Sequence, residues 1–177
     1  MRKSAIPVFT RDDRPGSTQE LTAGVPKDFA RARDEADPPH FRVLVADDDE
    51  MDRLLTIWHL GKAWPAERDM MVECAADGAE ALEKIRSSRF ALVVLDWNMP
   101  HRDGGDVLRA MREDGLRVPV VVVSGRRAEA IARDLETMAA AFVNKDELDP
   151  SSFRNAIAAS MLMQAGGCSV GSDSRDK

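Results

Sequence analysis

Residues 91–96 of the chain read Ala-Leu-Val-Val-Leu-Asp, a continuous apolar run that ends in an acid. An earlier run over Phe41–Ala46 ends in the same way, at Asp47 and Asp48. Strands that are apolar on both faces are typical of parallel sheets covered by helices on each side. If the two runs lie side by side, their three carboxylates meet at the carboxyl edge of the sheet, where open α/β sheets bind their ligands.

Strand-like and helix-like segments alternate five times from Phe41 onward. Apolar runs predict strands over 42–46, 70–74, 91–95, 119–123 and 141–143. Helical spacing predicts helices over 50–60, 79–86, 106–112, 128–138 and 151–163. This alternation predicts an α/β domain, a doubly wound parallel sheet with helices on both faces.

The expected helix ends carry their own local signals. Gly61 and Gly115 follow the first and third helices, where a left-handed C-terminal residue is favoured. Asp49 is predicted to cap the first helix, and Asp149-Pro150 to start the last one. The last two helices each have one apolar stripe, which predicts their inward faces as Ile131, Leu135 and Met138 and as Phe153, Ile157 and Met161.

Composition divides the chain of 177 residues into one ordinary domain and two flexible ends. Residues 1–40 hold five of the nine prolines and no sustained apolar period, so we expect them to be disordered. Residues 165–177 are rich in Gly and Ser and predict a flexible tail. The folded domain is therefore expected over 41–164, with no room for a second, output-bearing domain.

The net charge of −6 falls entirely on that domain, because the first forty residues carry seven basic and seven acidic side chains. An acidic domain without a basic stripe argues against a nucleic-acid partner. The two cysteines have no metal-ligand or disulfide spacing, and no run approaches membrane-spanning length. We expect a cytoplasmic protein without a membrane partner.

Five polar residues follow the predicted strands and share one edge of the sheet: Asp47, Asp48, Asp96, Ser124 and Lys145. Clustered carboxylates repel one another, and a hard cation such as Mg²⁺ relieves that repulsion. A lysine ammonium and a serine hydroxyl can hold phosphoryl oxygens, and an aspartate can attack phosphorus. The chain has no Walker-type loop, so the phosphoryl group must arrive on another molecule.

Over residues 41–164 the chain resembles the receiver domain of bacterial two-component response regulators, in its single-domain, chemotaxis-regulator-like form. The likeness is carried by Ala-Asp-Asp at 46–48 and by Asp-Trp-Asn-Met-Pro-His-Arg-Asp-Gly at 96–104. Ser124 and Lys145 complete the set. The resemblance implies a flavodoxin-like fold, a five-stranded parallel sheet of order 2-1-3-4-5 with five helices.

The resemblance also implies a role for each site residue. Asp96 would be the phosphorylated residue, and Lys145 would pair with its phosphoryl group. Mg²⁺ would be held by Asp47, Asp48, Asp96 and the carbonyl of Asn98. Ser124 would move toward the phosphoryl group, and Phe142 would turn inward as the switch aromatic.

Three positions depart from the family pattern. Asp146 follows the lysine where most members carry a cis proline, which predicts a trans peptide bond and a different loop shape. Gly125 follows Ser124 where a residue with a Cβ is commoner, and the connection over 61–69 is longer than usual. These departures concern the partner-binding face rather than the acidic pocket.

We therefore expect a stand-alone receiver rather than an enzyme. It would take its phosphoryl group from a histidine kinase or phosphotransfer protein and act on an unknown downstream protein, with a homodimer as a further possibility. Two alternatives stay open at this point. One is an interaction module that does not need phosphorylation. The other is a haloacid-dehalogenase-like phosphatase, although residues 47–51, Asp-Asp-Asp-Glu-Met, lack that family's hydroxyl residue.

Overall fold

The computed structural model describes residues 41–64, 69–125, 135, 138 and 140–165. The strands are β1 (Phe41–Ala46), β2 (Met70–Ala75), β3 (Leu92–Asp96), β4 (Val120–Ser124) and β5 (Ala141–Asn144). The helices are α1 (Glu50–Ala63), α2 (Gly78–Ser87), α3 (Gly104–Glu113), the short 3₁₀ helix η4 (Lys145–Glu147) and α5 (Pro150–Ala165).

The five strands form one parallel sheet in the order β2-β1-β3-β4-β5. This confirms the parallel sheet and the strand order that the resemblance implied. In the centre of the sheet, Ala46 pairs with Leu95, and Asp96 pairs with Val123. The ends of β1, β3 and β4 therefore lie next to one another at one edge.

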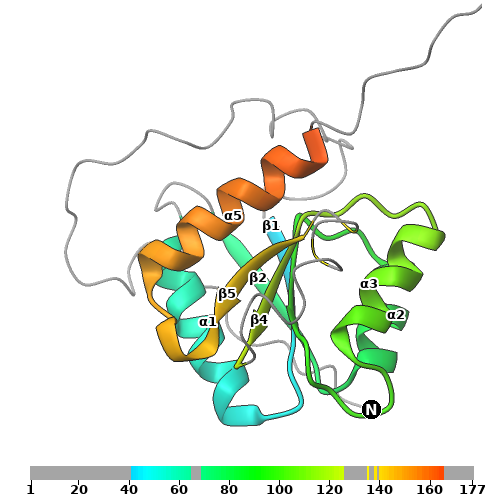
Figure 1. Cartoon of the computed structure of the whole chain (residues 1–177), viewed down its shortest axis with the longest axis horizontal. Coiled ribbons are helices and arrows are strands. Elements are labelled where there is room, and N and C mark those ends of the chain that lie inside the picture. The colour runs from blue at the N-terminus through cyan, green and yellow to red at the C-terminus, as the bar shows by residue number, and fades with distance from the viewer. Residues whose placement is uncertain (1–40, 65–68, 126–134, 136–137, 139, 166–177) are drawn as a thin grey trace, which may run out of the picture.

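Helices cover both faces of the sheet (Figure 1), with α1 and α5 on one face and α2 and α3 on the other. Alternate strand residues divide between the two cores, as the pleat requires. On β3, Val93 and Leu95 face the α2 and α3 side, whereas Leu92 and Val94 face the α1 and α5 side. Every residue of β3 and β4 is buried, which explains why both strands are apolar up to their last residue.

Most predicted helix ends are confirmed. Asp49 caps α1 by accepting hydrogen bonds from two backbone N–H groups, and Asp149 does the same at the start of α5. Gly115 follows α3 with φ +73°. The inward stripe of α5 is also confirmed, since Phe153, Ile157 and Met161 are all buried.

The prediction that Gly61 ends the first helix is wrong. The helix continues to Ala63, which is buried in the core, and Trp64, whose backbone is extended, is its C-cap. Packing of Leu60 and Ala63 against the sheet outweighs the cost of about 1 kcal/mol for glycine in a helix. Tertiary packing therefore outweighs the tendency of a glycine to end a helix.

The predicted helix over 128–138 lies outside the described residues, except for Leu135 and Met138. Both of these are helical and buried, as the predicted stripe requires. Ile131 and the terminal segments 1–40 and 166–177 are likewise outside the described residues. Within the part of the chain that the structure describes, none of the helices combines the length and apolar character needed to cross a bilayer.

Candidate functional site

The centre of the candidate site is a pair of buried aspartates, Asp47 and Asp96. Asp47 directly follows Ala46, and Asp96 directly follows Leu95, the residue that pairs with Ala46 in the sheet. The parallel register thus brings both side chains to the same edge and the same face. Their exposed fractions are only 1% and 4%, so two acids are buried where the apolar strands end.

Asp48 completes a group of three carboxylates. One oxygen from each of Asp47, Asp48 and Asp96 lies within 4.8 Å of the others, a spacing that a single metal ion could bridge. Asp48 is exposed, so the group opens toward solvent on one side. The juxtaposition of these three acids, predicted from two strand ends, is what the structure shows.

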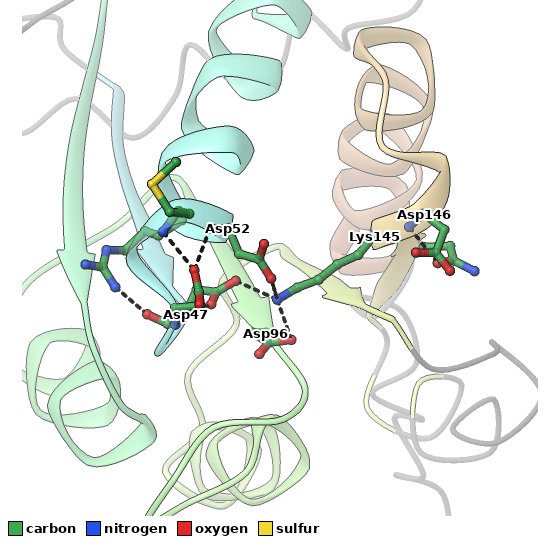
Figure 2. A network of polar contacts seen from close by, with 9 residues as sticks. Asp47, Asp52, Asp96, Lys145 and Asp146 are labelled. Atoms are coloured by element: carbon green, nitrogen blue, oxygen red, sulfur yellow. Dashed lines mark hydrogen bonds and ion pairs between the residues drawn. The ribbon is translucent and has the colours of Figure 1, made fainter.

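Lys145 reaches these acids from the start of η4 (Figure 2). Its Nζ donates hydrogen bonds to Asp47 Oδ2 at 2.9 Å and to Asp52 Oδ2 at 2.8 Å, and it lies 3.5 Å from Asp96 Oδ1. The ammonium is thus surrounded by three carboxylates. We call Lys145, Asp47, Asp52 and Asp96 the lysine cluster.

The protonation of the cluster reflects its burial. Burial raises the pKa of Asp47 and of Asp96 above the ordinary aspartate value of 3.8, despite the opposing effect of the Lys145 ammonium. Burial alone would lower the pKa of Lys145, but its hydrogen bonds to Asp52 and Asp47 raise it instead. The lysine is therefore a fixed cation, while the two buried acids ionise at a cost.

A tight loop follows Asp96 and ends at the first residue of α3. The N–H of Gly104 donates to the carbonyl of Trp97 at 2.9 Å, which closes the loop. A Cβ at Gly104 would lie 2.5 Å from the Asp96 carbonyl oxygen, so only glycine fits there. This contact explains the spacing from Asp96 to Gly104. Asn98 lies exposed in this loop, and its backbone N–H hydrogen-bonds Asp96.

Ser124 on β4 and Phe142 on β5 are the other two predicted site residues. Ser124 is fully buried and stands one residue after Val123, the register partner of Asp96. Phe142 is half-buried and packs against the apolar core on the α2 and α3 side. The structure thus brings Ser124 to the same edge as the acids and leaves Phe142 two residues short of it.

The peptide bond after Lys145 is trans, as predicted. The described residues contain no cis peptide bond. The N–H of Asp146, which a proline would lack, donates to Asn144 Oδ1 at 3.0 Å and starts η4. At Gly125, a Cβ would meet nothing within 4 Å, so space does not require this glycine.

The residues present fit a divalent cation. Asp96 Oδ1 is buried without a close hydrogen-bond donor among the described residues, and the Lys145 ammonium lies 3.5 Å away in an ion pair with it. A buried anionic oxygen without a hydrogen bond is costly. Carboxylate oxygens are the ligands that Mg²⁺ prefers, so an ion among these three acids would satisfy it.

The sequence-based prediction missed Asp52 and Arg53. Asp52 lies in the first turn of α1, where an acid is expected simply to favour the helix dipole. Instead, its carboxylate reaches Lys145, 93 residues away. Arg53 donates to the backbone carbonyl of Asp47 at 2.6 Å and holds the loop between β1 and α1. Neither contact has a signal in the local sequence.

Comparison with known proteins gives a consistent result. Residues 43–158, well over half of the chain, match the response regulator receiver domain. The chain is 38% identical over 89 residues to the transcriptional regulatory protein TctD of Salmonella typhimurium, covering 50% of this chain and 38% of that protein. It is 40% identical over 85 residues to the response regulator MprA of Mycobacterium ulcerans, covering 48% of this chain and 34% of the relative. The chain thus spans well under half the length of these curated relatives.

Solved receiver domains share the fold. The signal receiver domain of the putative response regulator NarL from Mycobacterium tuberculosis aligns with a TM-score of 0.56 and 30% identity, over 73% of this chain and 99% of that one. The bacteriophytochrome response regulator AtBRR aligns with a TM-score of 0.57 and 30% identity, over 69% of this chain and 93% of that one.

Proposed function

This chain belongs to the response regulator receiver domain family, and on that basis we propose that it accepts a phosphoryl group on Asp96 in a reaction that needs Mg²⁺. The observation that carries the proposal is that the lysine cluster and the group of three acids share Asp47 and Asp96. A buried carboxylate, a fixed cation and a metal-binding arrangement meet at one edge of the sheet. Family membership alone would not supply these side chains.

In the proposed reaction, a carboxylate oxygen of Asp96 attacks the phosphorus of the donor. A new P–O bond forms while the bond to the leaving group breaks, either P–N of a phosphohistidine or P–O of acetyl phosphate. The electron pair of the broken bond leaves with the imidazole or acetate. The Lys145 ammonium holds a phosphoryl oxygen, and the Ser124 hydroxyl donates to another.

Asp47, Asp48, Asp96 and the Asn98 carbonyl would hold the Mg²⁺ ion. The chemistry that an ion held there would supply is neutralisation of charge on the transferring phosphoryl group, which would ease the attack of one anion on another. The protein's own part is to hold Asp96 rigid at the end of β3 and to keep the Lys145 ammonium beside it.

Signalling would then follow from a change in packing near β4 and β5. A shift of Ser124 toward the phosphoryl group would open space for Phe142 and alter the surface that a partner contacts. We propose a histidine kinase or phosphotransfer protein as donor and a downstream protein as target. One relative is named a transcriptional regulatory protein, so the expected absence of a nucleic-acid partner stays a prediction.

Acetyl phosphate tests the proposal directly. Incubation with acetyl phosphate and Mg²⁺ should add one phosphoryl mass by intact mass spectrometry, and chelation of the metal should prevent it. Asp96→Asn should remove the adduct. Asp146→Asn is a matched control, because its carboxylate points away from the lysine cluster (Figure 2), and it should keep the adduct.

Three outcomes would contradict the proposal. The first is the absence of any adduct on the wild-type chain under these conditions. The second is an adduct that persists in Asp96→Asn. The third is steady turnover of a generic phosphate ester, which would favour the phosphatase alternative. If Asp96→Asn leaves the affinity for an identified partner unchanged, the module acts without phosphorylation.

A further inference from the structure

One carboxylate of the lysine cluster lies outside the group that could hold the metal. Asp47 and Asp96 contact Lys145 and also belong to the three acids grouped within 4.8 Å. Asp52 contacts Lys145 alone, from the first turn of α1. When a cation engages the three clustered acids, Asp52 is the carboxylate that still has its full charge available for the lysine.

The contact is also the shortest of the three that the ammonium makes. Nζ lies 2.8 Å from Asp52 Oδ2, 2.9 Å from Asp47 Oδ2 and 3.5 Å from Asp96 Oδ1. The ammonium thus lies closer to the Asp52 carboxylate on α1 than to that of Asp96, the proposed phosphoryl acceptor. Two of its three N–H groups donate to Asp47 and Asp52, and its contact with Asp96 is the longest of the three.

From this geometry we propose that Asp52 is a positioning residue that holds Lys145 in the unphosphorylated state and competes with the phosphoryl group for its ammonium. The inference rests on the phosphoryl-transfer function proposed above. Phosphorylation adds negative charge at Asp96 and requires the lysine there. Asp52 adds to the free energy needed to bring the Lys145 ammonium to the phosphoryl group, because the ion pair between Asp52 and Lys145 must first be weakened or broken.

The exposure of Asp52 limits the size of the effect. Its side chain is 46% exposed, against 2% for Asp47 and 4% for Asp96. Water screens a half-exposed ion pair, so removing the carboxylate should change binding by roughly two- to fivefold. The same screening makes the effect salt-dependent, because a Debye length falls to about 3 Å at 1 M salt.

Beryllofluoride, a stable phosphoryl mimic, tests this at equilibrium. Its affinity is measured by fluorine NMR at saturating Mg²⁺ for the wild type, Asp52→Asn and Asp52→Ala. Both variants should bind roughly two- to fivefold more tightly than the wild type. The gain should shrink as salt is raised. Glu50→Gln, which removes an equal charge from the same turn outside the lysine cluster, should bind like the wild type.

Other results would overturn the inference. Unchanged affinity in both Asp52 variants would show that Asp52 does not compete. Weaker binding in Asp52→Ala would show that it serves Lys145 as an anchor. An equal gain in Glu50→Gln would show a general charge effect. Melting temperatures of all variants check folding. If the wild type itself gains no phosphoryl mass from acetyl phosphate, the proposed function fails, which is distinct from the failure of this inference.

Discussion

The body of the sheet and its carboxyl edge are adjacent along the chain, but burial has opposite effects on the stability of their side chains. Val93, Val94 and Leu95 are buried and stabilise the fold through the hydrophobic effect. Asp96, the next residue, is buried to nearly the same degree, yet its burial raises its pKa and opposes ionisation. In this one strand, burial therefore stabilises the fold at the apolar residues and opposes ionisation at the acid of the candidate site.

The largest effect should come from the body of the sheet. Leu95→Ala removes a fully buried side chain and leaves a cavity, so we expect the free energy of unfolding to fall by about 2–5 kcal/mol. Denaturant unfolding measures this, with Leu162→Ala, 61% exposed on α5, as the control that changes it by less than about 0.5 kcal/mol. Equal losses in the two variants would remove the distinction between core and surface.

The next effect should come from the cation at the edge. Lys145→Met leaves Asp47 and Asp96 buried without their counter-ion. We expect a loss of about 2–3 kcal/mol, below the roughly 3–5 kcal/mol of a fully buried pair, because the acids can take up protons instead. The loss should be greatest at neutral pH and smaller in acid. A loss independent of pH would indicate packing rather than charge.

A smaller effect, of opposite sign, is expected for Asp96→Asn. Burial raises the pKa of Asp96 above 3.8, so the folded chain binds this proton more tightly than the unfolded chain. The stability that this proton contributes is full below pH 3.8 and is lost as the pH rises through the raised value. The variant should therefore be more stable than the wild type at pH 7, by about 0.5–2 kcal/mol.

Thermal unfolding across pH checks that prediction. The advantage of Asp96→Asn should shrink as the pH falls toward 3.8. Asp48→Asn is the matched control, since Asp48 is exposed and its substitution should change stability less at pH 7. An advantage that grows in acid would have the opposite sign and would show that the buried carboxylate stabilises the fold.

The smallest effect should come from the metal. Mg²⁺ at a concentration equal to its dissociation constant should stabilise the wild type by about 0.4 kcal/mol through mass action, which raises the melting temperature by about one to three degrees. Asp96→Asn should show less of this rise, because it lacks one of the three acids. The same rise in both proteins would place the bound ion elsewhere.

Much of the site was predictable because its parts are local. Apolar runs ending in Asp47 and Asp96 indicate strands and the edge at which they end, and the spacing from Asp96 to Gly104 reflects a loop that only glycine can close. The helix cap at Asp49 follows from side-chain chemistry alone. Gly61 was mispredicted because its signal is local, whereas the helix is extended by contacts with the sheet.

The amino-acid sequence alone determines the alternation of strands and helices, the acids at the strand ends and the family that these acids indicate. These features depend on residues that are neighbours along the chain. Only the folded structure establishes that α1 continues past Gly61 and that Asp52 and Asp47 both bind Lys145. Both outcomes depend on how α1 packs against the sheet and on contacts between residues far apart in the chain. No local pattern encodes such distances, because they arise when the whole core packs.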